Sequence, residues 1–340
     1  LVAEPQSRVR RSPRLIGGVD AAGIVVASTT SAIRPGDRVA VHGGDLGVGR
    51  DGGFAGVVAA PARYVSVLPS TVSTRDAMVL GTAGFTALAS LLALEHHGLA
   101  VNDGEVLVTG ATGGVGVWSV VALAHRGYAV TASTGSTSEH EWLADRGAAR
   151  VIGREEIADR PERVLASERW AGAVDCVGGD TLHQILRSLR YGAAVAASGL
   201  VASATLTTNV YPFITRNVAL LGIDAVEASA ATRDKVWELA GQLVPSLEIE
   251  PLIDSVIDLE ELPNALDTIR RTAACPADGI SIGPAEGATG RSRQSKRGVE
   301  SGWRSRFAGS MVPSARRYVS VTYSGSRHGV VAIFVSLTHA

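Results

Sequence analysis

A short apolar segment that runs directly into a cluster of glycines constrains the fold of this chain more than any other feature. Residues 105–109 are mostly apolar, residues 110–116 include four glycines, and an apolar stretch of helical length follows at once. Glycine permits a tight turn and lets the backbone approach a pyrophosphate, which the free N–H groups of a helix N-terminus can bind. Strand, glycine turn and helix in this order predict a dinucleotide site. The expected pyrophosphate contacts are Thr112, Gly113, Gly114 and Val115; an ordinary strand-to-helix turn is the alternative.

Two patterns flank this loop, and together they predict an α/β fold. Between residues 76 and 270, strand-like and helix-like stretches alternate as in βαβ units, which indicates a doubly wound parallel Rossmann sheet. Residues 15–70 alternate short β-branched runs with Gly and Pro turns, which is typical of a small antiparallel barrel. The 340 residues, 46% of them hydrophobic, suffice for two cores. The parallel strands are expected at 105–109, 128–132, 150–152, 173–177, 193–198 and 218–223, and helices at 114–126, 138–146 and 180–189.

The segment after the second expected parallel strand bears on the choice of cofactor. In sites that prefer NAD, an acidic residue at this point holds the 2′-hydroxyl of the adenosine ribose. Here residues 133–138 are hydroxyl-rich and contain no acid, so Thr134, Gly135 and Ser136 are candidate cofactor contacts. Arg154 is a candidate cation for the adenine or the phosphate, with a solvated surface arginine as the alternative. The pattern favours NADPH over NADH.

The glycine loop also fits the Thr-Gly-x-x-x-Gly-x-Gly pattern of short-chain dehydrogenases, but two features oppose that class. The loop follows about a hundred residues, whereas in short-chain dehydrogenases it lies near the start of the chain. The catalytic Tyr-x-x-x-Lys of that class has no counterpart, because no lysine stands four residues after Tyr64, Tyr128, Tyr191 or Tyr211.

Five segments that occur here in order carry a more specific resemblance, which covers roughly residues 13–270. Together they resemble the quinone oxidoreductase group of the medium-chain dehydrogenase/reductase superfamily, and in particular its acrylyl-CoA reductase (YhdH/YhfP) branch. The segments are Pro35-Gly36-Asp37-Arg38-Val39, Gly81-Thr82-Ala83-Gly84-Phe85-Thr86-Ala87, Val108 to Gly116, Asp175-Cys176-Val177-Gly178-Gly179 and Pro212-Phe213-Ile214-Thr215-Arg216-Asn217-Val218.

This resemblance implies a GroES-like barrel beside the Rossmann domain, NADPH as hydride donor, reduction of an activated C=C bond in an enoyl-CoA, quinone or enone, and a homodimer. It places Leu200, Ile214 and Ala225 on the nicotinamide side of the cleft, with core packing as the alternative for Leu200 and Ile214. Thr82 and Thr86 could line the cleft. Arg216 could reach a phosphate of the cofactor or of CoA, or it could cap a helix end. The resemblance leaves the catalytic residues unassigned.

Composition excludes several other classes of protein. The zinc-dependent branch needs a cysteine and a His-Glu pair, but residues 17–20 are Gly-Gly-Val-Asp and the chain has only two cysteines, Cys176 and Cys275, so zinc-independent chemistry is expected. A formal net charge of −1 favours neither nucleic acid nor membrane partners. Few cysteines, no signal-like start and apolar runs too short to span a bilayer predict a soluble cytoplasmic protein.

Both ends depart from the family pattern. Family members have further residues ahead of the segment that matches residues 15–20, and residues 272–340 are rich in Gly, Ser, Arg and Ala, which predicts a disordered tail. We therefore expect a truncated start and a reading frame displaced near residue 271, and the alternative function is a catalytically inactive nucleotide-binding chain. The expected divisions are 1–80 (a partial, incomplete GroES-like domain), 81–224 (Rossmann), 225–271 (a return to the catalytic domain) and 272–340 (tail).

Overall fold

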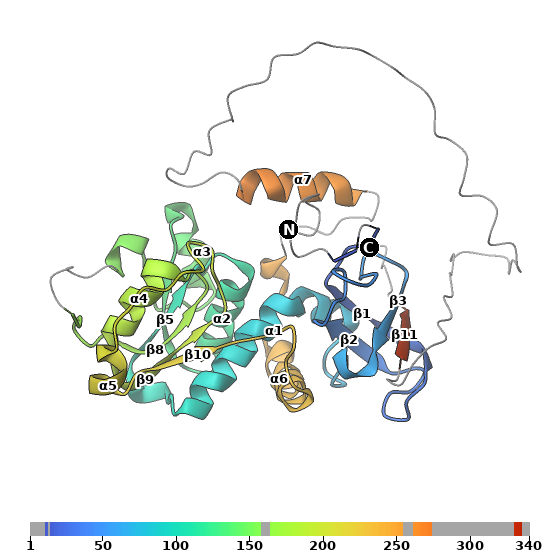
Figure 1. Ribbon diagram of the computed structural model, residues 1–340, viewed down its shortest axis with the longest axis horizontal. Coiled ribbons are helices and arrows are strands. Elements are labelled where there is room, and N and C mark those ends of the chain that lie inside the picture. Colours follow the sequence, from blue (N-terminus) through green and yellow to red (C-terminus); the bar gives the residue numbers. More distant parts are fainter. Residues whose placement is uncertain (1–10, 13, 158–163, 254–260, 274–329, 335–340) are drawn as a thin grey trace, which may run out of the picture.

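The computed structural model describes residues 11–12, 14–157, 164–253, 261–273 and 330–334. These residues form two sheets at opposite ends of the molecule, with helix α1 (Thr74–His97) between them (Figure 1). The predicted α/β architecture is confirmed: one sheet is parallel and Rossmann-like, and the other is small and antiparallel.

The larger sheet has six parallel strands in the order β10-β9-β8-β5-β6-β7. All six match the strands predicted from the sequence, although β8 and β9 begin three and four residues earlier than expected. The strands are β5 (Glu105–Thr109), β6 (Ala129–Ser133), β7 (Arg150–Ile152), β8 (Trp170–Asp175), β9 (Leu189–Ala197) and β10 (Ala219–Gly222). The helices that connect or follow them are α2 (Gly114–His125), α3 (His140–Asp145), α4 (Gly179–Ser188), α5 (Tyr211–Arg216), α6 (Ala230–Leu243) and α7 (Leu262–Ala273).

The smaller sheet is antiparallel and runs in the order β3-β11-β1-β2-β4. Its strands are β1 (Asp20–Ser28), β2 (Arg38–His42), β3 (Val57–Pro61), β4 (Val65–Val67) and β11 (Val330–Phe334). Because side chains alternate along a strand, β1 and β2 divide between two cores. Ala21 and Val39 belong to a core within the small sheet, whereas Ala22 and Ala40 pack in the core that contains α1.

Strand β11 differs from the disorder predicted for residues 272–340. Its five residues pair with β1 on one side and with β3 on the other. The run Val-Val-Ala-Ile-Phe favours a strand, and two neighbouring strands satisfy its backbone groups on both sides. Most of the predicted tail, residues 274–329 and 335–340, lies outside the described residues.

Helix α1 was not among the predicted helices, and it joins the two sheets. A capping box between Ser73 and Asp76 starts it, and Gly98 ends it in the left-handed conformation. Gly81 interrupts it with φ of 51° and ψ of −162°, so a second helical segment begins at Thr82. The expectation that no apolar run is long enough to span a bilayer fails at α1, which by length and composition is the one described helix that could cross a membrane. However, 61% of its most apolar window is buried inside the protein. That burial identifies it as a core helix of this fold.

Candidate cofactor site

The glycine cluster forms the turn between β5 and α2, and it leaves the start of α2 open. Thr112, Gly113 and Gly114 are exposed, and no side chain caps the helix. Gly113 donates its N–H to the carbonyl oxygen of Gly110 at 2.9 Å, which closes the turn. The first N–H groups of a helix have no partner inside it, and the helix dipole places partial positive charge there. This arrangement can hold a pyrophosphate.

Gly116 is required by the close contact between α2 and the turn. A Cβ at this position would overlap the carbonyl oxygen of Gly110 and the backbone of Ala111. Gly114 lies against Ala83 of α1, whose Cβ would be 3.1 Å from a Cβ on Gly114. The turn therefore contacts its own backbone and α1 on one side, while Thr112, Gly113 and Gly114 remain exposed on the other.

The residues predicted to meet the adenosine ribose lie together at the end of β6. Thr134 Oγ1 is 3.4 Å from Thr112 Oγ1 and accepts a hydrogen bond from the backbone N–H of Ser136 at 3.1 Å. The Arg154 guanidinium lies directly over Gly135, because a Cβ there would be 2.5 Å from Arg154 Cζ. Gly135, Ser136 and Arg154 are all exposed. Hydroxyls and one cation thus surround the position where NAD-preferring sites place an acid.

The buried carboxylate of Asp175 stabilises the strand end and the loop next to this site. Asp175 at the end of β8 is fully buried; it accepts the Thr109 hydroxyl at 2.6 Å and the backbone N–H groups of Gly178 at 2.9 Å and Val177 at 3.2 Å. Burial raises the pKa of Asp175, and these hydrogen bonds oppose that shift. Asp175 therefore ties the end of β5 to the loop that follows β8.

Leu200 and Ala225 both follow the carboxyl ends of their strands, as predicted. Leu200 comes after β9 and is 66% exposed, which argues against core packing, and Ala225 comes after β10 and is buried. Ser198 lies before Leu200, and its buried hydroxyl has no hydrogen-bond partner among the described residues other than the weakly bonding thiol of Cys176. Burial raises the pKa of that thiol to about 12, so Cys176 is no nucleophile at neutral pH.

Ile214 is not brought together with these two residues. It lies in α5, is 72% exposed, and precedes β10 instead of following a strand. Its proposed contact with the nicotinamide stays a prediction of the resemblance.

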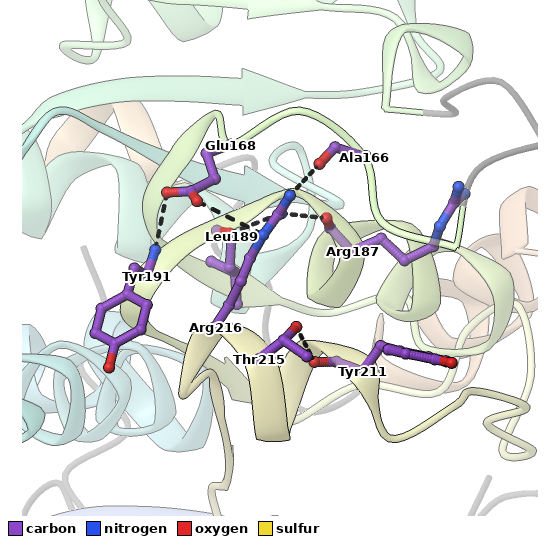
Figure 2. Close-up of polar contacts among 8 residues, drawn as sticks. All are labelled: Ala166, Glu168, Arg187, Leu189, Tyr191, Tyr211, Thr215 and Arg216. Atoms are coloured by element: carbon purple, nitrogen blue, oxygen red, sulfur yellow. Dashed lines mark hydrogen bonds and ion pairs between the residues drawn. The ribbon is translucent and has the colours of Figure 1, made fainter.

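Arg216, the last residue of α5, caps a helix end. Its guanidinium donates to the carbonyl oxygens of Arg187 at 2.8 Å and Ala166 at 2.6 Å, and its Nε lies 3.6 Å from the Glu168 carboxylate (Figure 2). A longer bond of 3.4 Å reaches the carbonyl oxygen of Leu189, the first residue of β9. These contacts lie at the amino end of β9, whereas Leu200 follows its carboxyl end. Of the two predicted alternatives, the contacts match the cap at the end of α4.

The hydroxyls of Thr82 and Thr86 both donate hydrogen bonds within the protein. The Thr82 hydroxyl donates to Asp20 Oδ1 at 2.6 Å, and the Thr86 hydroxyl donates to the carbonyl oxygen of Thr82 at 2.7 Å. Thr82 therefore joins β1 to the kink in α1, and burial raises the pKa of Asp20. Thr86 is buried. Asp20 belongs to the Gly17–Asp20 segment that lacks a His-Glu pair, and nothing in the neighbouring sequence indicates its bond to Thr82.

The described residues do not offer a zinc ligand set. No group of three or more His, Cys, Asp and Glu side chains gathers among them. His42, the histidine nearest to the Gly17-Gly18-Val19-Asp20 segment, has its Nε2 2.9 Å from the guanidinium of Arg233. The nicotinamide dinucleotide, by contrast, fits the residues present: an uncapped helix start, a backbone approach that only glycine allows, and a cation with hydroxyls at the ribose end.

Comparisons with known proteins agree with this geometry. A family model described as "Zinc-binding dehydrogenase" matches residues 114–242. The "Putative quinone oxidoreductase YhfP" of Bacillus subtilis (strain 168) is 45% identical over 262 residues, which cover 77% of this chain and 79% of the relative. The "Acrylyl-CoA reductase AcuI" of Ruegeria pomeroyi is 42% identical over 255 residues, 75% of this chain and 77% of the relative.

Solved structures of such relatives carry nicotinamide dinucleotides. The yhdH oxidoreductase from Salmonella enterica, solved in complex with NADP, has a TM-score of 0.75 and 38% identity over 78% of this chain and 82% of that chain. The Bacillus subtilis yhfP protein, solved with NAD bound, also has a TM-score of 0.75, with 43% identity over 78% of this chain and 80% of that chain.

Proposed function

The chain belongs to the medium-chain dehydrogenase/reductase superfamily, in the YhdH/YhfP/AcuI branch of its quinone oxidoreductase group, and from this premise we propose a reductase of activated carbon–carbon double bonds that prefers NADPH. Membership makes the protein a nicotinamide-dependent oxidoreductase. The preference for NADPH and the type of acceptor are the proposal. The observation that carries it is the open start of α2 beside a ribose-binding loop that has hydroxyls and Arg154 instead of an acid.

Each part of the proposed site has a separate task. The N–H groups of Gly114 and Val115 and the hydroxyl of Thr112 bind the pyrophosphate, while Gly113, whose own N–H closes the turn, lets the backbone come close to it. Thr134, Gly135, Ser136 and Arg154 surround the adenosine ribose, and the guanidinium pairs with a 2′-phosphate through charge-assisted hydrogen bonds. Leu200 and Ala225 border the nicotinamide at the carboxyl ends of β9 and β10, where open α/β sheets bind their ligands.

When bound, the cofactor supplies the hydride. The protein contributes orientation: the pyrophosphate contacts and the walls after β9 and β10 hold the two reacting groups in line, and this alignment can supply a large part of a rate enhancement. The described residues offer no zinc ligand set, so no step is assigned to zinc.

The acceptor class follows from the branch. We propose an α,β-unsaturated thioester such as acrylyl-CoA first, because AcuI relatives are acrylyl-CoA reductases, and a quinone second, because YhfP is named a putative quinone oxidoreductase.

The division into 1–80, 81–224 and 225–271 is kept as a proposal, and residues 330–334, predicted as part of the tail, are added to the small sheet. The return segment 225–271 is supported by two contacts: the Tyr64 hydroxyl bonds the Glu227 carboxylate at 3.0 Å, and the Thr71 hydroxyl bonds the carbonyl oxygen of Gly241 at 2.8 Å. A cytoplasmic location and a homodimer complete the proposal. Strand β10 lies at an edge of the parallel sheet as described, and such an edge can pair with a second copy, which supports the homodimer.

Titration of the full chain with NADPH and, separately, with NADH tests the proposal, with nicotinamide fluorescence as the signal. Tighter binding of NADPH is expected. An acceptor screen then starts from acrylyl-CoA and a quinone, followed by loss of absorbance of the reduced nicotinamide. If the chain bound neither NADPH nor NADH, the proposal would be wrong about the cofactor. Binding without turnover of any activated alkene contradicts it at the reaction and leaves a nucleotide-binding chain without reductase activity.

A further inference from the structure

Arg233 is a buried cation that no part of the proposed cofactor site uses directly. It lies in the first turn of α6 and is only 2% exposed. Its Nη1 donates to His42 Nε2 at 2.9 Å and to the His42 carbonyl oxygen at 3.1 Å. Its Nη2 donates to the carbonyl oxygen of Val226 and its Nε to that of Ala228, each at 3.1 Å. Removing a guanidinium from water is costly, so this residue has to be held by all of these acceptors.

The acceptors belong to two segments that lie far apart in the sequence. One is the end of β2 at His42, and the other is the loop 224–228 between β10 and α6. The two segments are also joined directly, because Gly44 donates its N–H to the Val226 carbonyl oxygen at 3.0 Å. Gly43 has φ of 79°, and a Cβ there would overlap the same oxygen, so glycine is needed for this close approach. Arg233 thus clamps the loop onto the small sheet.

The His42 ring is a fixed acceptor in this clamp. It packs on Phe85 of α1 with ring centroids 4.1 Å apart, and burial together with Arg233 lowers its pKa to about 3. The ring is therefore neutral at physiological pH. The bond from Arg233 assigns the lone pair to Nε2 and the proton to Nδ1.

The clamped loop carries Ala225, which we assign above to the nicotinamide end of the cofactor site. Asp224 shapes the loop further, since its Oδ1 accepts the N–H groups of Val226 at 2.7 Å and Glu227 at 3.2 Å. We infer that Arg233 is a positioning residue. Through His42 and the carbonyl groups of Val226 and Ala228, it holds the loop 224–228, and with it Ala225 at the nicotinamide, against the small sheet. This inference rests on the proposed function. Within the part of the chain that the structure describes, no hydrogen bond joins the adenosine end of the site, at Thr134 and Arg154, to this clamp.

The test is Arg233→Met, with Lys235→Met as the matched control on the exposed side of the same helix. Two ligands separate the two ends of the site: 2′,5′-ADP reports the adenosine end alone, and NADPH fluorescence reports the nicotinamide. We expect Arg233→Met to bind 2′,5′-ADP within about twofold of the unmodified chain, while the emission of bound NADPH moves toward that of free NADPH. Backbone amides of residues 226–228 should exchange hydrogen at least about tenfold faster. Lys235→Met should change none of these.

A second pair of variants guards against a general loss of structure. His42→Gln keeps an acceptor for Arg233 and should resemble the unmodified chain, whereas His42→Leu removes the acceptor and should reproduce Arg233→Met. Unchanged NADPH emission and unchanged exchange at 226–228 in Arg233→Met would overturn the inference, as would an equal loss of 2′,5′-ADP and NADPH binding in His42→Leu. If the unmodified chain bound neither ligand, the proposed function would fail. The exchange rates of the ligand-free variants would still decide whether the clamp exists.

Discussion

The two ends of this molecule are built from sequence in different ways. In the parallel sheet, the proposed pyrophosphate turn occupies one continuous stretch from Thr109 to Gly116, and the proposed ribose loop follows the next strand. In the small sheet, β11 comes from residues 330–334, yet it lies between β1 and β3, which precede it in the chain by about 300 and 270 residues. Local patterns therefore specify the first region, whereas contacts between distant segments specify the second.

The difference has an energetic side. A local turn and helix gain their contacts at a small cost in chain entropy, but strands separated by long segments must first close large loops. The small sheet also depends on polar bonds across its boundary, such as Asp20 with Thr82 and His42 with Arg233. Substitutions in the pyrophosphate turn should therefore mainly weaken nucleotide binding, whereas substitutions in the small sheet should mainly lower the free energy of unfolding.

The largest effect is expected from Gly116→Val in the proposed pyrophosphate turn. The new side chain would overlap the Gly110 carbonyl oxygen and displace the start of α2. We expect NADPH binding to weaken by roughly 100-fold, about 2.8 kcal/mol. The free energy of unfolding should fall by about 1–3 kcal/mol through overpacking. Titration and denaturant unfolding measure the two losses. Gly56→Ala is the control, because a Cβ there meets nothing within 4 Å; equal effects in both variants would contradict the role of the turn.

The small antiparallel sheet is tested by Ala332→Pro in β11. This strand has neighbours on both sides, and proline removes a backbone donor and distorts the ladder. We expect a loss of about 2–3 kcal/mol in unfolding free energy with 2′,5′-ADP affinity nearly unchanged. Ala332→Val keeps the N–H and serves as control. If the proline variant unfolded as the unmodified chain does, the pairing of β11 with β1 and β3 would be wrong.

A pH dependence should arise at the junction of the two regions. The pKa of His42 is lowered from 6.5 to about 3 in the folded protein, so folding favours the neutral ring. The stabilisation is therefore fully present above pH 6.5 and is lost progressively as the pH falls toward 3. His42→Gln should remove this component, so its unfolding free energy should fall less steeply between these limits. Parallel pH profiles of the two proteins would show that His42 is not buried in its neutral form.

The comparison also explains what could be predicted from the sequence. All six parallel strands were predicted, because each is a short apolar run next to a turn signal, and the glycine loop was predicted because its residues are contiguous. Helix α1 was missed since the glycine-rich segment 81–87 suggested a motif instead of a helix, and Gly81 does break it. Arg233 carried no local signal, because an arginine in an amphipathic helix normally faces solvent. Its burial depends on carbonyl groups supplied by His42 and by the loop 224–228.

The smallest expected effect sharpens the cofactor choice within the local region. Arg154 is exposed, and its guanidinium lies over Gly135 with hydroxyls nearby. Removal of the charge by Arg154→Leu should weaken NADPH binding about tenfold, near 1.4 kcal/mol, because one charge-assisted contact to the 2′-phosphate is lost. NADH lacks that phosphate, so its affinity should not change. Arg34→Leu, which removes an exposed arginine next to the small sheet, controls for net charge. If Arg154→Leu weakened both nucleotides equally, the guanidinium would contact the adenine or the shared pyrophosphate, and the preference for NADPH would have to come from the hydroxyls of Thr134 and Ser136.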